Sequence, residues 1–553
     1  MIGPVPGIRW LALGAAFFTL SCAKSPARTG LASDQRQWWR DGVCYEIFVR
    51  SFADSDGDGI GDLRGLTARL DYLNDGNPNS TTDLGANCIW LMPISKSMTY
   101  HGYDVADYYH VNPQYGTDED FRQLMREAHR RGIRVIVDFV PNHSGSQNPY
   151  FQSALRGPGS PHRDWYRWSA AKPAQPGPWG QQAWHKSPVR DEYYYGVFWH
   201  EMPDLNYQAP AVLNEMKNVT RHWLTDMGAD GFRFDAIPYL VEEGNALKHS
   251  RGTHRVLREL GDAIRRVAPS SFTIGEMADG SAQILSSYYP DQLDAYFAFD
   301  VAAGTLASAR TEAAAPFLKA VREADSLFPA GRWAPFLTNH DQPRVMTALA
   351  GDRARARVAA SAMLMLPGIP FVYYGEEIGM SGTKPDEQIR TPMQWSSEPG
   401  GGFTTGTPWE SPQPDWKVTN VQAQMPQPGS LLNHYRKLIH LRNSNPALSR
   451  GSLTLLETSD TTGTIAAWLR SSPDEAFLIV VNFGRRHGEL VMERLPRSLL
   501  PGGGDFRLEP AYADPSNACA GPFFGYTLPG GVPTILIRSV EAHGFCALRL
   551  RRR

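Results

Sequence analysis

The chain has 553 residues, of which 42% are hydrophobic and 20% charged, an ordinary globular composition that is too long for one core and indicates two or three domains. Its 55 basic and 57 acidic residues nearly balance and form no basic run to follow a phosphate backbone, which argues against nucleic acid as a partner. Neither composition nor charge defines an oligomeric state.

The first 22 residues predict an export signal. Arg9 gives a short positive segment, and residues 10–20 form an apolar run too short to span a bilayer. Leu20-Ser21-Cys22 resembles the end of a bacterial lipobox, although Thr19 stands where that motif usually has Leu, Val or Ile. We therefore interpret residues 1–22 as a signal peptide of lipoprotein type, with membrane attachment through a lipidated Cys22. The alternative that stays open is ordinary cleavage nearby; in both cases we expect an exported protein, periplasmic or at the cell surface.

From about residue 40 to residue 380, apolar β-branched runs alternate with helical patterns, which is typical of parallel strands joined by crossover helices. In one unit Thr117 can cap a helix with Asp120, Gly132 ends that helix, and a buried strand follows at residues 133–139. The apolar face of this helix consists of Phe121, Leu124, Met125 and Ala128.

Eight such strands are predicted, at residues 43–49, 88–92, 133–139, 231–234, 272–274, 295–299, 334–337 and 369–374. Eight alternating units favour an α/β fold of the (β/α)8 TIM-barrel class over an open doubly wound sheet, whose G-x-G-x-x-G turn we do not find. The barrel would comprise residues 37–143 and 207–449.

Two further segments do not fit the barrel pattern. Residues 144–206 are rich in Pro, Gly, Trp and Tyr and exceed any usual loop, so we predict an inserted subdomain B after the third strand. Residues 450–553 contain short strands, which predict a C-terminal all-β domain of the sandwich type. Those strands are expected at residues 465–469, 477–481 and 534–537.

Besides Cys22, four cysteines remain of the five. Cys519 and Cys546 lie in one C-terminal segment and form the more plausible disulfide in an oxidising compartment. Cys44 and Cys88 fall in consecutive predicted strands, where we expect small buried thiols.

Four acidic residues stand at the ends of predicted barrel strands: Asp138, Asp235, Glu276 and Asp341. A lone carboxylate at such a position is usually a cap or a salt-bridge partner. Several carboxylates converging on one mouth repel one another, and this is the face on which barrel enzymes work. A functional site is therefore the better explanation.

The segments around these residues resemble the signature segments of the α-amylase superfamily of glycoside hydrolases. They read Asp138-Phe-Val-Pro-Asn-His143, Gly231-Phe-Arg-Phe-Asp235, Gly275-Glu276 and Phe336-Leu-Thr-Asn-His-Asp341, with Gly85-Ala-Asn-Cys-Ile-Trp-Leu-Met-Pro93 and Gly368-Ile-Pro-Phe-Val-Tyr-Tyr-Gly-Glu-Glu377 similar to its second and eighth strands. Each segment alone is weak, but their order and spacing from roughly residue 40 to residue 450 are specific. The resemblance implies retaining hydrolysis of an α-glucosidic bond.

Carried over by position, the resemblance makes Asp235 the nucleophile, Glu276 the general acid/base and Asp341 the group that holds sugar hydroxyls in the transition state. A retaining glycosidase needs one carboxyl protonated and the other ionised. Arg233 lies two residues before Asp235 and so on the same face of the strand, where it can keep that carboxylate charged.

The resemblance also implies five further residues around the bound glucose. His143 and His340 would hydrogen-bond the sugar, Asp104 with Arg390 would hold its far side, and Tyr103 would stack beneath it.

A loop of alternating carboxylates follows the first predicted strand. Alternating acids separated by glycines suit an oxygen cage for a hard cation, and Ca2+ fits best as a structural ion. The loop is similar to the calcium loop of the oligo-1,6-glucosidase branch, which implies the side chains of Asp54, Asp56, Asp58 and Asp62 and the carbonyl of Ile60 as ligands.

The choice of substrate is less defined. Met202-Pro-Asp-Leu-Asn206 lies between the patterns of the oligo-1,6-glucosidases and the neopullulanases and resembles a group with bacterial α-amylases, some of them lipoproteins. Asp235-Ala-Ile-Pro238 lacks the Lys-His of many α-amylases, which puts their second calcium site in doubt, while the small Ala236 resembles α-1,4 enzymes.

We therefore expect endo-acting cleavage of α-1,4 bonds in starch, maltodextrins or malto-oligosaccharides. The alternatives are an exo-acting α-glucosidase or oligo-1,6-glucosidase, to which Arg390-Thr-Pro-Met-Gln-Trp395 points, then a trehalose synthase or other transglycosidase. A non-catalytic relative is the hypothesis from another class, and the intact acidic triad argues against it.

Overall fold

The structure is a computed structural model. It describes residues 35–278, 280–493, 506–512, 519–520, 524–528 and 532–552, together with Gly3 and Leu495. The predicted signal peptide and Cys22 lie outside these residues. Within the described part of the chain, no helix has the length and apolarity needed to cross a membrane.

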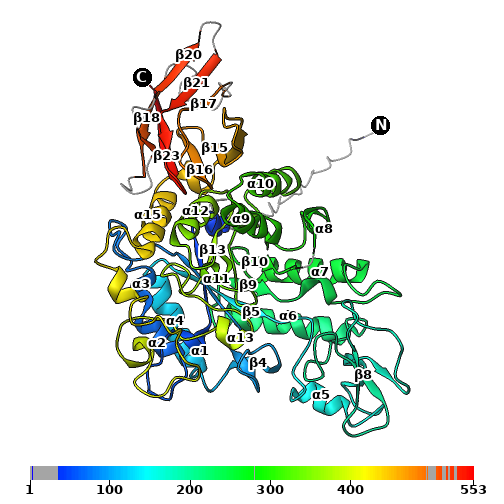
Figure 1. The fold of residues 1–553 in the computed structure, drawn as a ribbon. Coiled ribbons are helices and arrows are strands. Elements are labelled where there is room, and N and C mark those ends of the chain that lie inside the picture. The colour runs from blue at the N-terminus through cyan, green and yellow to red at the C-terminus, as the bar shows by residue number, and fades with distance from the viewer. Residues whose placement is uncertain are drawn as a thin grey trace.

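Eight parallel strands form a nearly closed barrel at the centre of the molecule (Figure 1). They are β1 (Cys44–Ile47), β2 (Cys88–Leu91), β5 (Arg134–Phe139), β9 (Gly231–Phe234), β10 (Phe272–Gly275), β11 (Ala295–Phe297), β12 (Trp333–Ala334) and β13 (Phe371–Tyr373). Neighbours in the chain pair in the sheet, and β13 returns to β1. Between β12 and β13, the amides of Ile369 and Phe371 donate to the carbonyls of Trp333 and Pro335. The predicted TIM barrel is confirmed.

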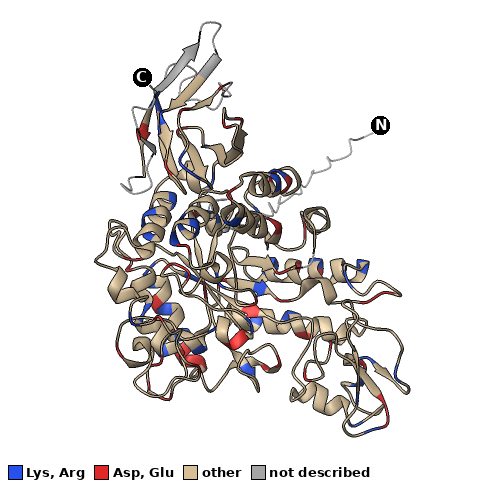
Figure 2. Cartoon of the chain, viewed as in Figure 1, with Lys and Arg blue, Asp and Glu red and all other residues tan. Residues whose placement is uncertain are grey.

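Helices surround the barrel, and Lys and Arg are interspersed with Asp and Glu along them (Figure 2). The capping box expected at Thr117 and Asp120 begins α4 (Asp118–Arg130), whose predicted apolar face is buried. The other helices are α1 (Val49–Phe52), α2 (Leu63–Ala68), α3 (Leu70–Leu73), α6 (Pro210–Thr225), α7 (Arg251–Val267), α8 (Ala282–Ser286), α9 (Phe299–Thr311), α10 (Ala315–Leu327), α11 (Val345–Ala348), α12 (Arg353–Leu364), α13 (Asp386–Ile389), α14 (Val421–Gln424), α15 (Leu431–Asn443) and α16 (Pro446–Ser449).

The long segment between β5 and α6 stands to one side of the barrel (Figure 1). It contains α5 (Pro149–Ala154), a 3₁₀ helix (Arg163–Trp165) and an antiparallel sheet of β6 (Trp168–Ser169), β8 (Tyr193–Tyr195) and β7 (Trp184–Lys186). A β-bridge between His143 and Asp204 joins its two ends. A hairpin of β3 (Ser95–Ser97) and β4 (Val105–Val111) follows β2. Both additions emerge beyond the carboxyl ends of barrel strands, where they can shape a pocket.

The C-terminal region is built of antiparallel sheets, as predicted (Figure 1). One sheet has the order β14 (Ser452–Leu456), β15 (Ile465–Ser471), β16 (Ala476–Asn482), β23 (Phe545–Arg552) and β18 (Phe506–Pro510). The others pair β17 (Leu490–Met492), β21 (Val532–Ile537) and β20 (Phe524–Leu528), and β19 (Cys519–Ala520) with β22 (Ser539–Val540). A buried apolar cluster that includes Leu478 and Ile535 joins the two larger sheets.

Cys44 and Cys88 form a disulfide, so the expectation of buried free thiols is wrong. The two residues are partners in the register of β1 and β2, with Cα atoms 4.2 Å apart. Parallel strands in register point both thiols to the same side of the sheet, within bonding reach. Cys546 is also disulfide-bonded, whereas the side chain of Cys519, its predicted partner, lies outside the described residues.

Candidate active site

Backbone pairing brings three predicted acidic residues to one mouth of the barrel. Asp138 on β5 is the register partner of Arg233 on β9. Just beyond these strands, the amide of Asp235 donates to Phe139 at 2.9 Å, and the amide of Glu276 donates to Phe234 at 3.0 Å. The same hydrogen-bond ladder that builds the sheet therefore sets Asp138, Asp235 and Glu276 on adjacent strands.

Arg233 is the positive charge at the centre of these acids. Its guanidinium is 1% exposed and donates from Nη1 to Asp235 Oδ1 at 2.6 Å and to Asp138 Oδ1 at 3.0 Å. Its Nη2 lies 3.7 Å from Glu276 Oε2. A buried guanidinium needs buried partners, so Arg233 and the acids hold one another in place.

The surroundings give Asp235 and Glu276 different proton affinities. Burial raises the pKa of both carboxyls, that of Glu276 to about 7, while Arg233 opposes the rise. Of these two carboxyls only Asp235 accepts a short hydrogen bond from Arg233, so Asp235 is the better carboxylate, and Glu276 is the group that holds a proton up to about pH 7. Glu276 Oε2 also accepts the amide of Ala236 at 3.1 Å. Ala236, directly after Asp235, adopts a left-handed conformation (φ 49°, ψ 37°), which is unfavourable for a residue with a Cβ.

A chain of hydrogen bonds lies beneath the acids. The hydroxyl of Tyr103 donates to Asp138 Oδ2 at 3.2 Å and lies 2.7 Å from His340 Nε2. His340 Nδ1 lies 2.6 Å from Glu46 Oε1. Burial lowers the pKa of His340 well below its usual value and raises that of Glu46. The sequence interpretation missed Glu46, whose only signal was a carboxylate in the middle of an apolar strand.

Asp341 is held by a separate cation. Arg390 Nη2 donates to Asp341 Oδ1 at 2.9 Å, and Arg390 Nε donates to the carbonyl of His340 at 3.0 Å. Burial would raise the pKa of Asp341, but His340, Arg390 and Arg233 together lower it. The Asp341 side chain is 46% exposed, so an ionised carboxylate faces the pocket. Asp386, which the sequence interpretation also missed, accepts from Arg390 Nη2 at 3.2 Å.

His143 and Asp104 differ in how far their side-chain atoms already have hydrogen-bond partners. Burial lowers the pKa of His143 to about 3, so its ring is neutral, and its Nε2 has no hydrogen-bond partner among the described residues. Asp104 is buried, and its carboxylate accepts from the amide of Met98 at 3.2 Å and from the hydroxyls of Ser97 and Thr99. Asp104 is predicted to hold the glucose together with Arg390, but of the two only Arg390 is among the described residues that line the pocket.

Asp235, Glu276, Asp341, His143 and Arg390 all open into one pocket of about 430 Å³, together with Tyr103. A cavity of this size is typical of small-molecule sites. Arg233 and His340 are buried and are not among the described residues that line this pocket. The predicted catalytic acids therefore share one solvent-accessible space, with neutral and charged hydrogen-bonding groups around them.

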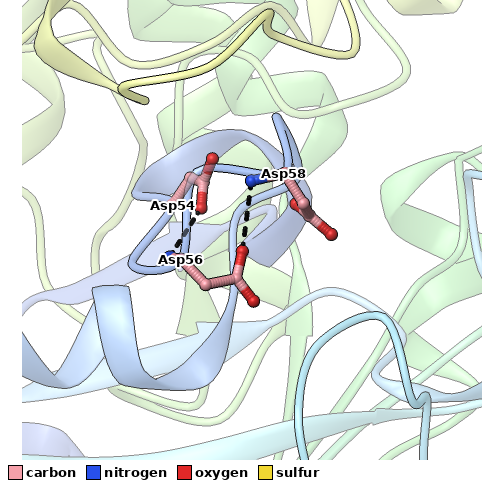
Figure 3. A group of neighbouring side chains, drawn as sticks. All are labelled: Asp54, Asp56 and Asp58. Carbon is pink, nitrogen blue, oxygen red and sulfur yellow. Dashed lines mark hydrogen bonds between the residues drawn. The ribbon is translucent and has the colours of Figure 1, made fainter.

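The loop after β1 gathers a second set of carboxylates. Oxygen atoms of Asp54, Asp56 and Asp58 lie within 4.8 Å of one another (Figure 3). Asp54 Oδ1 accepts the amides of Asp56 at 3.0 Å and Gly57 at 2.8 Å, and Asp56 Oδ1 accepts the amide of Asp58 at 3.2 Å. No Lys or Arg of the described residues forms a salt bridge with these three groups. Their hard oxygen atoms fit Ca2+.

Asp62 has a different place in this loop. Its Oδ1 accepts the amide of Gly65 at 2.7 Å as the N-cap of α2, and its Oδ2 accepts the amide of Ser55 at 2.7 Å. Asp62 thus connects the loop to α2 through these hydrogen bonds and is not part of the cluster of Asp54, Asp56 and Asp58. The amide of Ile60 donates to Asp58 Oδ1 at 2.8 Å, which orients that carboxylate.

Another set of buried oxygens lies where the inserted segment meets the barrel. Asn142 Oδ1, Asp204 Oδ2 and Glu242 Oε1 have no hydrogen-bond partner in the described chain. Burial and then the charge of Glu242 raise the pKa of Asp204, while Asn142 lowers it. Unpartnered buried oxygens of this kind suit a hard cation. Sequence reasoning left a second calcium site in doubt because the Lys-His pair is missing.

Comparison with known proteins identifies relatives across most of the chain. The model of the α-amylase catalytic domain matches residues 46–451. Alpha-amylase 3 of Dictyoglomus thermophilum is 38% identical over 457 residues, which cover 81% of this chain and 86% of that protein. The oligo-1,6-glucosidase of Parageobacillus thermoglucosidasius is 31% identical over 526 residues, 82% of this chain and 91% of that protein. The crystal structure of the α-amylase from H. orenii superposes with a TM-score of 0.79 and 37% identity, covering 93% of this chain and all of that one (100%).

Proposed function

This chain belongs to the α-amylase family of glycoside hydrolases, and from that premise we propose that it cleaves α-1,4-glucosidic bonds in starch, maltodextrins or malto-oligosaccharides. One observation carries the proposal. A single pocket contains Asp235, hydrogen-bonded to a buried guanidinium, and Glu276, whose pKa is raised to about 7. This asymmetry is what a nucleophile and an acid require.

In the proposed reaction Asp235 attacks the anomeric carbon while Glu276 protonates the leaving oxygen, which breaks the glycosidic bond and forms a glycosyl–Asp235 ester. Glu276, now ionised, then removes a proton from water, and the water oxygen displaces Asp235. Arg233 holds Asp235 ionised and aligned for attack. The anomeric configuration is retained because the carbon is inverted twice.

The remaining pocket residues are proposed to bind the glucose unit before the cleaved bond. Asp341, oriented by Arg390, would accept hydrogen bonds from sugar hydroxyls as charge develops on the ring. The neutral His143 offers to a sugar hydroxyl an Nε2 that no described residue hydrogen-bonds. The ring of Tyr103 lies nearly parallel to that of His340 and supports the sugar from below.

Preference for the α-1,4 bond is proposed from Ala236. Its backbone donates to Glu276, and its methyl group leaves room beside the nucleophile. An exo-acting α-glucosidase or oligo-1,6-glucosidase is the second candidate, supported by the segment at residues 390–395 and by the 31% identical relative.

Ca2+ is proposed to bind Asp54, Asp56 and Asp58 and to stabilise the loop after β1. Export and lipid attachment at Cys22 are proposed from the leader sequence alone. Labelled palmitate found in the mature protein would support the anchor, and its absence there would exclude it.

The purified protein should be incubated with starch, maltotriose, isomaltose, pullulan and trehalose, and the products sized. Mixed oligosaccharides from starch support endo-acting α-1,4 cleavage. If glucose is the sole product from starch, the enzyme is exo-acting and the proposal of endo action is wrong. If isomaltose alone is cleaved, the enzyme is specific for α-1,6 bonds. Asp235→Asn is the blank for contaminating activity.

A further inference from the structure

An aromatic wall extends from the sugar-binding part of the pocket to its rim. The rings of His143 and Phe198 have centroids 5.4 Å apart, and Phe198 lies 5.5 Å from both Tyr239 and Trp179. Trp179 also packs on Tyr239 at 5.1 Å. All four rings line the pocket. The wall is therefore continuous from the proposed glucose contact outward.

The outermost ring of this wall remains open to solvent. Trp179 is 52% exposed, whereas Tyr239 beneath it is 6% exposed. An indole that is half exposed inside a pocket presents a flat apolar face with a polar edge. The faces of a pyranose ring are apolar and its edges carry hydroxyls, so the two surfaces are complementary.

The local fold holds Trp179 in this position. The amide of Gly180 donates to the carbonyl of Gly177 at 3.0 Å, which closes a tight turn around Trp179. The amide of Trp179 donates to the side chain of Gln181 at 2.9 Å, and Gln181 Nε2 donates to the carbonyl of Val197 at 2.9 Å. The turn is thus attached to the segment that carries Phe198. A surface fixed before binding loses little entropy when a sugar stacks on it.

The outer part of the wall, formed by Tyr239 and Trp179, is connected to the group that is proposed to protonate the leaving oxygen. Glu276, which would protonate the leaving oxygen, is hydrogen-bonded to the amide of Ala236, and the amide of Tyr239 donates to the carbonyl of Ala236 at 3.2 Å. Tyr239 in turn supports Trp179. One continuous path therefore connects the acid to the exposed indole.

We propose that Trp179, backed by Phe198 and Tyr239, is a stacking site for glucose units beyond the cleaved bond, so that the enzyme favours oligosaccharides over substrates with no sugar there. This inference rests on the proposed function and adds a specificity-determining residue to it. Binding energy at Trp179 would be realised only when the leaving group is itself a glucan.

The test compares two substrates that differ in the leaving group. α-D-Glucosyl fluoride occupies only the glucose site, whereas maltopentaose also reaches Trp179. For Trp179→Ala we expect kcat/KM for maltopentaose to fall about tenfold or more, as for a truncated aromatic anchor, and that for glucosyl fluoride to stay unchanged. Trp179→Phe should keep most of the maltopentaose activity.

Trp199→Ala is the matched control. Trp199 belongs to the same segment, is 39% exposed, packs on His200 and is not part of the pocket lining, so neither substrate should be affected. Unfolding temperatures of all variants separate loss of contact from loss of fold.

An unchanged kcat/KM for maltopentaose in Trp179→Ala, or an equal loss on both substrates, would overturn the inference while leaving the proposed function intact. If the wild-type protein hydrolyses neither substrate, the proposed function fails. In that case calorimetry should compare maltopentaose binding to Asp235→Asn and to the double variant that also carries Trp179→Ala. Binding that is tenfold weaker in the double variant supports a sugar-binding site at Trp179, and equal binding excludes it.

Discussion

The barrel mouth and the loop after β1 each gather at least three carboxylates, but only the mouth has a cation built into the chain. Arg233 donates to Asp138 and Asp235 at the mouth. In the loop, Asp54 and Asp56 accept backbone amides, and their group has no Arg or Lys partner among the described residues. Burial explains the difference, because buried charges need partners nearby, whereas exposed carboxylates are screened by water and salt. The charges at the mouth are therefore balanced within the protein, and we propose that an ion from solution balances those of the loop.

The largest effect is expected from changing Asp235. Asp235→Asn keeps the shape of the side chain but removes the nucleophile, so kcat should fall by about 10⁴-fold or more. Asp138→Asn, on the same guanidinium, is the control and should lose less. Steady-state kinetics on maltopentaose distinguish them, and equal losses would show that charge balance alone explains the effect.

The next effect concerns the cation at the mouth. Arg233→Lys keeps a charge but loses the planar fork that reaches both acids, so we expect kcat/KM to fall by roughly 10²-fold to 10³-fold. Unfolding should also become easier, because the shorter ammonium group leaves at least one of the two buried acids without its hydrogen bond. Arg134→Lys, at an exposed pair with Asp230, is the control. Full activity in Arg233→Lys would mean that any positive charge suffices.

The pH dependence follows from Glu276. Its pKa is raised to about 7, and it must be protonated to serve as the acid, so kcat/KM on maltopentaose should fall tenfold per pH unit above about 7. Fluoride leaves without a proton, so the fall in kcat/KM above about pH 7 should be missing with glucosyl fluoride. The same fall with both substrates would assign the titration to a group other than Glu276.

Glu46 should have a smaller effect, because it acts through His340. Glu46→Gln replaces the carboxyl group 2.6 Å from His340 Nδ1 with an amide, and we expect a roughly tenfold loss of kcat/KM, as for a group that sets the orientation of a histidine. The pH dependence of kcat/KM should also differ between Glu46→Gln and the wild-type enzyme. A variant with wild-type rates and pH profile would contradict a positioning role.

Changes in the loop after β1 should alter the stability of the fold and leave catalysis in the pocket unchanged. Removing Ca2+ by a chelator should lower the unfolding temperature, since an ion at 100 times its Kd stabilises by about 2.7 kcal/mol. Asp58→Asn should abolish the response to added Ca2+, and Asp262→Asn on the exposed face of α7 should keep it. A calcium response that persists in Asp58→Asn would place the ion elsewhere.

Much of the fold could be predicted because its signals are local. The capping box at Thr117 and the acids at strand ends follow from periodicity and short motifs. Glu46 and Asp386 were missed because their partners, His340 and Arg390, come from distant segments, and strand alternation does not identify which residues meet across a barrel.

Contacts within the folded chain also give several motif residues roles other than the predicted ones. Asp62 fits the alternating pattern of the loop, yet the end of α2 uses it as a cap. Asp104 fits a sugar-binding position, yet hydroxyls of the β3 hairpin occupy its carboxylate. Cys44 and Cys88 were expected to be free because register between strands is a property of the assembled barrel. Trp179 lies in the inserted segment, where no periodic pattern indicates which side chains face the pocket.

The identity of the nucleophile is the central claim, and covalent trapping tests it most directly. A 5-fluoro-α-glucosyl fluoride should form a glycosyl ester that hydrolyses slowly, and peptide mapping by mass spectrometry should place the sugar on Asp235. A label on Glu276, Asp138 or Asp341, or turnover with inversion and no covalent adduct, would contradict the account.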